Sequence, residues 1–168
     1  MKIRISNYNI AISSFLVIIT YLLAVLSIQL IAPDVVISPD EFPDNCPTDS
    51  NNCAMIGPNP HRVNGLIELR FQSELSSVMS EANKWIESNP RSEIIGEWEN
   101  QTHAVFRTLF LRFPDDFVIH GSCDNGESVL LVYSESRVGY SDLGVNPERV
   151  SDFSTFMSGI EMPTSDCS

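Results

Sequence analysis

Residues 134–149, SESRVGYSDLGVNPER, join an apolar run to a segment with helical periodicity, and they decide the C-terminal half of the fold. The order Asn146, Pro147, Glu148 is typical of a helix start, with an N-cap, a proline at the first helical position and an acidic first turn. Apolar residues then recur at helical spacing as far as Gly159. We therefore predict a helix that begins after the Asn146 cap and ends at Gly159.

Four runs upstream of this stretch are rich in β-branched and aromatic residues, which is typical of strands. They cover residues 93–99, 102–113, 117–121 and 128–134. The polar connections between them are short, and parallel neighbours would need a long crossover, so the strands must pair antiparallel. The sequence predicts a meander of about four strands.

A second helix is predicted before the meander. Apolar residues follow a 3.6-residue period from Ser73, a candidate N-cap, to Ser88, where the following proline disfavours helical geometry. Two helices packed on one face of the antiparallel sheet give an α+β fold, which we assign to residues 61–168.

The N-terminus predicts a membrane anchor. Residues 1–9 carry Lys2 and Arg4, and residues 10–32 form an uncharged apolar run whose helical length of roughly 34 Å exceeds a hydrocarbon core of about 30 Å. This run is longer than the apolar core of a cleaved signal peptide and lacks an A-x-A cleavage pattern, which favours an uncleaved signal anchor over cleavage. The flanking charges predict a cytoplasmic N-terminus and an extracytoplasmic domain.

Residues 33–60 are rich in Pro, Asp and Asn, which indicates an extracytoplasmic tether followed by an irregular loop. Outside the cytoplasm, four cysteines are most simply two disulfides, although three pairings exist. We expect Cys46 to pair with Cys53 and Cys123 to pair with Cys167. A metal site is the alternative, but there is no C-x-x-C pattern and no helical His pair to support it.

The chain after residue 32 is strongly acidic. It holds 8 basic and 22 acidic residues, a net charge of −14. No basic stripe is present to neutralise phosphates, so nucleic acid and anionic lipid surfaces are discounted as partners. An acidic, lysine-poor surface also suggests a halophilic source, with an ordinary acidic extracytoplasmic protein as the alternative.

Residues 134–149 also supply most of the candidate ligand-binding residues. Arg137 and Arg149 flank a loop that leads to a helix N-terminus, where free N–H groups favour a carboxylate or phosphate. In the alternative, Arg137 pairs with Asp142 or with the two acids of the preceding turn and only holds the loop in place. The complete set of candidates is Asp115, Asp116, Arg137, Tyr140, Asp142, Asn146 and Arg149.

Other chemistries have weaker support. Calcium could use the side-chain oxygens of Asp115, Asp116, Asp142 and Asn146, but no EF-hand spacing is present. A triad of Ser136, His120 and Asp142 lacks any motif of a serine hydrolase. Neighbours on a strand point to opposite faces, which argues against a carboxylate pair at Asp115 and Asp116. No catalytic residue, metal or nucleotide cofactor is therefore predicted.

Two motifs carry a resemblance to a known family. FPDDF at residues 113–117 and YSESRVGYSDLGVNPER at residues 133–149 resemble domain-of-unknown-function family 1499. Tyr133 stands where that family often has arginine, and the Cys46–Cys53 segment has a longer spacing than usual. The resemblance implies a small secreted, lumenal or membrane-anchored domain and no established catalytic residue.

From these features we expect an anchored domain that binds a small polar or anionic ligand or a partner protein. A hydrolytic enzyme of the cell envelope and a purely structural envelope protein are the alternatives.

Overall fold

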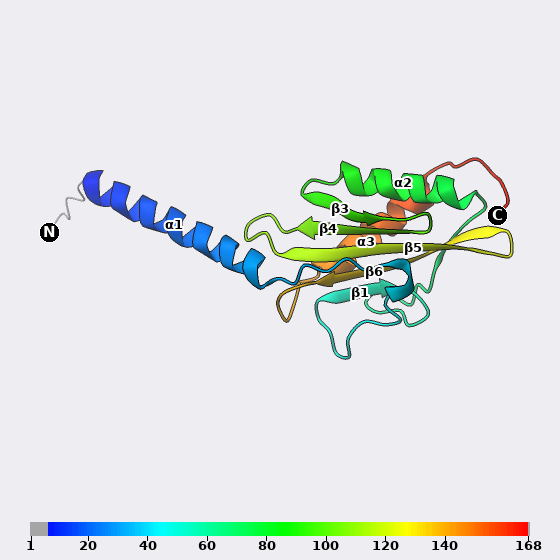
Figure 1. Ribbon diagram of the computed structural model, residues 1–168, viewed down its shortest axis with the longest axis horizontal. Helices are drawn as coiled ribbons and strands as arrows, with labels where there is room; N and C mark the ends of the chain where they lie inside the picture. Colours follow the sequence, from blue (N-terminus) through cyan, green and yellow to red (C-terminus); the bar gives the residue numbers. More distant parts are fainter. Residues whose placement is uncertain (1–6, 168) are drawn as a thin grey trace.

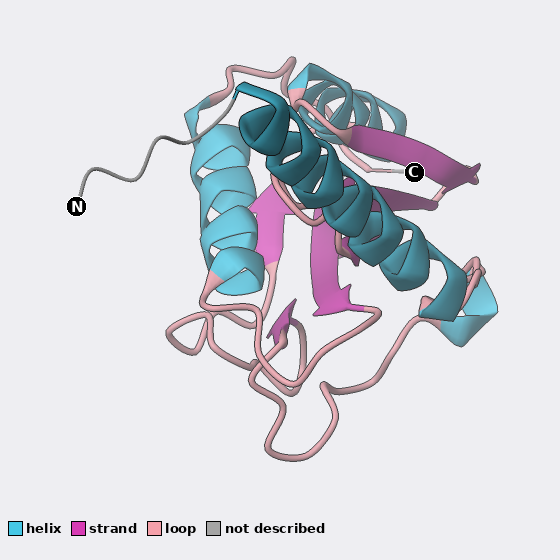
Figure 2. Cartoon of the chain, turned by 90° about the vertical axis from the view of Figure 1, so that its left-hand side faces the viewer, coloured by secondary structure: helices cyan, strands magenta, loops and turns pink. Residues whose placement is uncertain are grey.

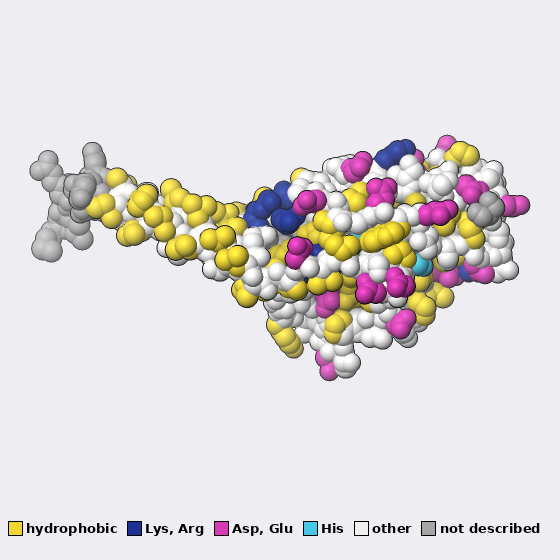
Figure 3. Space-filling model, in the orientation of Figure 1, with side chains coloured by type: hydrophobic (Ala, Val, Ile, Leu, Met, Phe, Trp, Pro, Cys, Tyr) yellow, Lys and Arg dark blue, Asp and Glu magenta, His cyan; other side chains and the backbone are white. Residues whose placement is uncertain are grey.

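The computed structural model describes residues 7–167, and Figure 1 shows a long helix projecting from an α+β domain. This helix, α1 (Asn7–Ile31), contains one uncharged span, Ile10–Ile31, that is long and apolar enough to cross a membrane. Its apolar side chains cover its visible surface (Figure 3). The predicted basic residues Lys2 and Arg4 lie outside the described residues.

The domain is built on one antiparallel sheet, as predicted. The strands run in the order β1-β6-β5-β4-β3, and β2 pairs with a second part of β6. Their bounds are β1 Cys53–Ile56, β2 Leu69–Phe71, β3 Ser92–Glu97, β4 Gln101–Arg107, β5 Pro114–Asp124 and β6 Glu127–Ser136.

The predicted number of strands is wrong, because the described sheet has six strands rather than about four. The two extra strands, β1 and β2, are short, and the alternation of apolar and charged residues around β2 covers too few residues to predict a strand, so their form depends on pairing with β6. The second predicted strand also extends too far. Arg107 pairs with Pro114, which leaves residues 108–113 as the loop between β4 and β5.

Two helices pack on one face of the sheet, as predicted, and we call this the helix face. They are α2 (Leu75–Ser88) and α3 (Val145–Gly159). Trp85, Phe117 and Phe153 meet in the core between the layers, with ring centroids 5.1 to 5.5 Å apart. This apolar core holds the helices against the sheet.

Both predicted helix caps are wrong. The N-cap of α2 is Glu74 rather than Ser73, and the N-cap of α3 is Gly144, with Asn146 already inside the helix. Gly144 has φ +92°, a conformation that glycine adopts without steric cost. The helix therefore begins earlier than its Asn-Pro-Glu signal indicates.

The opposite face of the sheet is covered by residues 33–46, which we call the strap. Ile37 and Phe42 of the strap pack against a small cluster that contains Met55, Val118 and Tyr133. In Figure 1 this segment runs from the end of α1 along the sheet. The part of the chain predicted as a tether is thus packed against the domain.

Two cysteine pairs lie at disulfide distance, and both are the predicted pairs. Cys46–Cys53 joins the end of the strap to β1, with Cα atoms 5.9 Å apart. Cys123–Cys167 joins the hairpin of β5 and β6 to the C-terminal tail, with Cα atoms 5.5 Å apart.

Candidate functional site

Asp115 and Asp116 are neighbours on β5, and their side chains lie on opposite faces of the sheet. Asp115 pairs with Arg149 of α3 on the helix face, while Asp116 pairs with Arg137 on the strap face. The alternation of side chains along a strand causes this separation. The two carboxylates therefore belong to two different networks.

The network around Asp116 fastens the strap. Arg137 donates to both oxygens of Asp116 at 2.8 to 3.1 Å, and it donates to the carbonyls of Pro33 and Val35 at 2.9 and 2.8 Å. His103 is fully buried and donates from Nε2 to Asp116 Oδ1 at 2.6 Å. Its Nδ1 accepts the Ile37 N–H at 2.9 Å. Every polar group of this network has a partner.

The network around Asp115 is incomplete. Arg149 donates to Asp115 Oδ2 at 2.8 Å and to Ser134 Oγ at 3.0 Å, and its guanidinium lies 4.7 Å from the centre of the Phe106 ring. Asp115 is only 1% exposed, yet its Oδ1 has no hydrogen-bond partner among residues 7–167. An unpaired carboxylate oxygen in this position is costly, because burial removes the water that would otherwise satisfy it.

The loop between β6 and α3 is held by Asp142. Its carboxylate accepts the N–H groups of Gly144 and Asn146 at 3.0 and 2.9 Å, and Arg62 at 3.1 Å. Burial alone would raise the pKa of Asp142, but these three donors together lower it below its usual value. Asp142 thus caps α3, the role that the sequence assigned to Asn146.

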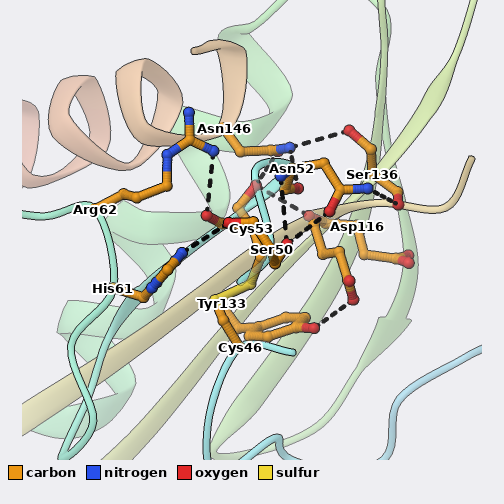
Figure 4. Close-up of a disulfide and its surroundings, with 12 residues drawn as sticks. Cys46, Ser50, Asn52, Cys53, His61, Arg62, Asp116, Tyr133, Ser136 and Asn146 are labelled. Carbon is orange, nitrogen blue, oxygen red and sulfur yellow. Dashed lines mark hydrogen bonds between the residues drawn. A yellow bond between two sulfur atoms is a disulfide. The ribbon is translucent and has the colours of Figure 1, made fainter. Parts of the chain in front are cut away.

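Asn146 instead joins three segments in the interior. Its amide donates to the Asn52 carbonyl at 2.8 Å and to Ser136 Oγ at 3.1 Å, and its Oδ1 accepts from Ser134 at 2.7 Å and from Arg149. Figure 4 shows the contacts with Asn52 and Ser136 beside the Cys46–Cys53 disulfide. This residue locks the sheet to α3.

A pocket of about 330 Å³ lies at the end of the domain from which α1 projects, and we call it the end pocket. Its walls come from residues 108–113 and from residues 136–145, and Asp115 also lines it. Leu109, Phe110 and Leu143 are exposed, so they mark its rim. The pocket is therefore lined mainly by apolar side chains, and the buried Asp115 is among its lining residues.

The structure does not bring the predicted residues together around one ligand. Arg137 and Arg149 lie on opposite faces of the sheet, and each is engaged by its own carboxylate. Tyr140 is 81% exposed. Asp115 and Asp142 share the end pocket, but Asp116 does not line it. Ligand binding at these residues stays a prediction.

The histidine considered for catalysis lies away from Ser136. Ser136 pairs with Asp115, whereas His120 lies five positions further along β5 and pairs with Leu131, so the proposed triad is not assembled although Asp142 and Ser136 share the end pocket. Within residues 7–167, no three His, Cys, Asp or Glu side chains form a group that could hold a metal ion.

Comparison with known families identifies the family of this chain. The sequence profile of DUF1499, described as a protein of unknown function, matches residues 43–156. The chain belongs to the DUF1499 family. The resemblance seen in the sequence is thereby confirmed, and the match includes both aspartates and the loop before α3. No curated protein matches the sequence.

Tyr133 occupies the position at which we noted arginine in other DUF1499 sequences. Its hydroxyl donates to Glu135, and its ring lies in the cluster under the strap. Burial and this carboxylate together raise the pKa of Tyr133, which keeps the phenol protonated. In this DUF1499 chain the position is therefore uncharged.

Sequence reasoning missed several residues of the site. His103 and Arg62 were not among the predicted site residues, and the loop 108–113 was predicted as part of a strand. One signal was available for the loop, because Leu-Phe-Leu-Arg-Phe at residues 109–113 lacks the alternation expected of a half-buried strand.

Proposed function

We propose that this DUF1499 protein is a membrane-anchored binding domain whose end pocket takes a small apolar molecule that carries one hydrogen-bond donor. The observation that supports this most strongly is the unpaired Oδ1 of Asp115, a buried residue that lines a mainly apolar pocket. A ligand donor would satisfy this oxygen, and the apolar walls would desolvate the rest of the molecule.

The charge around Asp115 defines the ligand further. Arg149 already balances this carboxylate, so a neutral donor such as a hydroxyl fits better than a second cation. Asp115 and Asp142 both line the pocket, and each is already paired with an arginine, so neither arginine is free to bind an anion. The geometry thus favours an apolar alcohol over the anionic ligand expected from the sequence, and a cavity of this size favours a small molecule over a partner protein.

Two contacts support the uncleaved anchor. Tyr21 of α1 donates to the Phe110 carbonyl at 2.8 Å, and Gln29 donates to the Arg112 carbonyl at 2.7 Å. A segment that is removed after translocation would have no use for bonds to the folded domain. The two cysteine pairs and the basic N-terminus support an extracytoplasmic domain with the N-terminus in the cytoplasm.

Photo-crosslinking tests the proposed ligand class. The full chain in phosphatidylcholine nanodiscs is irradiated with alkyl diazirines of equal length that end in a hydroxyl, a methyl ketone or a carboxylate. We expect the hydroxyl probe to label residues 108–113 and 136–145 several-fold more than the other two, because only the hydroxyl donates to Asp115. Peptide mass spectrometry measures the labelling.

Asp115→Asn sharpens the test. The new amide oxygen would face Arg149 and the amide N–H₂ would replace Oδ1, so the pocket would offer a donor instead of an acceptor. We expect the ketone probe to gain labelling relative to the hydroxyl probe. Asp116→Asn is the matched control, since Asp116 does not line the pocket, and it should leave the probe ratio unchanged. Equal labelling by all three probes, or an unchanged ratio in Asp115→Asn, would refute the proposal.

A further inference from the structure

Exposed apolar side chains surround the end pocket. Leu143 is 95% exposed and Phe110 is 75% exposed, and Leu109, Leu111 and Tyr140 are also exposed. They lie on the two loops that form the pocket walls, residues 108–113 and 137–144. Exposed apolar residues gathered around a pocket mark an interaction surface. We call these five residues the rim surface.

The rim surface lies beside α1. The loop 108–113 accepts hydrogen bonds from Tyr21 and Gln29, which are separated by eight positions or about 12 Å along the helix. Figure 2 views the domain from this end, with α1 passing in front of it. In Figure 3, basic side chains gather where the helix meets the domain. The loop therefore follows the last turns of the helix that would cross the membrane.

The hydrogen bonds from Tyr21 and Gln29 would stabilise the loop 108–113 inside a bilayer. An irregular loop exposes backbone carbonyls, and hydrocarbon offers no water to pair with them, so such a loop is tolerated only where protein groups satisfy it. Tyr21 and Gln29 supply donors to two of these carbonyls, and the loop in turn satisfies two polar side chains of an otherwise apolar helix. The contacts suit a loop that lies at membrane depth.

We propose that the rim surface enters the outer leaflet of a neutral lipid bilayer, and that the ligand of the end pocket enters from that leaflet. This inference rests on the proposed anchor and deepens the proposed binding function. Continuity with α1 identifies the partner as the bilayer rather than a protein. The net charge of −14 after residue 32 disfavours anionic lipid, so the partner surface is zwitterionic or uncharged. The exposed position of the rim puts the pocket mouth in contact with the acyl chains.

Fluorescence quenching tests the insertion. Phe110→Trp in the full chain is placed in phosphatidylcholine vesicles with brominated acyl chains, and the wild-type signal of the native tryptophans is subtracted. Phe156→Trp is the matched control, because Phe156 is also exposed but lies eleven positions beyond the start of α3. We expect bromine to quench the indole at position 110 at least twofold more strongly. Equal quenching at the two positions would overturn the inference.

The route of the ligand is tested separately. Leu143→Asp places a charge at the pocket rim, which should lower labelling by a long-chain hydroxyl probe loaded in the bilayer several-fold. A short, water-soluble hydroxyl probe should label this variant as well as it labels the wild type. Unchanged labelling by the bilayer-loaded probe, or a loss no greater than that of the water-soluble probe, would overturn entry from the leaflet.

The quenching and labelling experiments distinguish failure of this inference from failure of the proposed function. Selective labelling by the hydroxyl probe without quenching at position 110 would support the proposed binding site and refute the membrane contact. Quenching at position 110 without selectivity among the probes would support the membrane contact and refute the proposed ligand class.

Discussion

The two faces of the sheet use the same residue type in different ways. On the strap face, Asp116 is bonded by Arg137 and His103, and no acceptor is left over. On the helix face, its neighbour Asp115 meets Arg149 with one oxygen and leaves the other unpaired at a pocket. The first carboxylate holds a covering segment in place, while the second has one oxygen without a partner in the described part of the chain. Strand alternation alone separates the two roles.

The largest expected effect is on the free energy of unfolding when each of these two aspartates is replaced by asparagine. Asp116→Asn puts an amide N–H₂ against Arg137 or His103, which are donors themselves, and should lower the free energy of unfolding by about 3 kcal/mol, as when one partner of a buried ion pair is lost. Asp115→Asn also removes the charge partner of a buried arginine. Its amide oxygen can stay on Arg149, and its N–H₂ replaces an oxygen that had no partner, so we expect a smaller loss of about 2 kcal/mol. Urea unfolding followed by tryptophan fluorescence measures both.

Equal losses in the two variants would contradict this difference between the faces. Hydrogen exchange then locates the damage. In Asp116→Asn the amides of residues 33–46 should exchange faster while those of α2 do not change.

The second prediction concerns the covalent fastening of the strap face. Replacing Cys46 and Cys53 by serine should lower the free energy of unfolding by about 2.5 kcal/mol, the chain-entropy value for so short a loop. The strap should also lose protection from exchange, because its end is no longer tied to β1. Reduction of the wild type is not an adequate test, since it also opens Cys123–Cys167. A strap that stays protected in the double variant would show that the polar contacts alone hold it.

The parts of the fold that sequence predicts well are the parts with regular periodicity. The meander, the extent of α2 to Ser88 and the end of α3 at Gly159 all follow from local patterns, and they match the structure closely. β1 and β2 could not be found in this way. They are four and three residues long, and only their pairing with β6 makes them strands.

The candidate site shows the same limit. Sequence indicates that Asp115 and Asp116 must face opposite ways, and that Arg137 is held by an acid. It does not indicate which arginine reaches which acid, because these pairs join residues 21 and 34 positions apart. Nor can it show an unsatisfied oxygen, since Asp115 Oδ1 lacks a partner only once α3 and both loops are in place.

The smallest expected effect is a pH dependence confined to the strap face. His120 on β5 lies against Phe42 of the strap, with ring centroids 5.2 Å apart, and its Nδ1–H donates to Gln101. Burial lowers the pKa of His120 below its ordinary value of 6.5. The folded state therefore binds this proton less tightly than the unfolded chain. The contribution of His120 to stability is complete above pH 6.5 and is lost as the pH falls through its lower folded pKa.

The helix face should not respond in this way, because the core under α2 and α3 contains no histidine. We expect the unfolding free energy of the wild type to decrease as the pH falls below 6.5, and to decrease less steeply in His120→Gln. Urea unfolding at a series of pH values measures the two slopes. Since Asp116, Arg137 and His103 remain in the variant, any difference in slope belongs to His120. Identical slopes would mean that protonation of His120 leaves the packing of Phe42 unchanged, and that the strap depends on the Asp116 network instead.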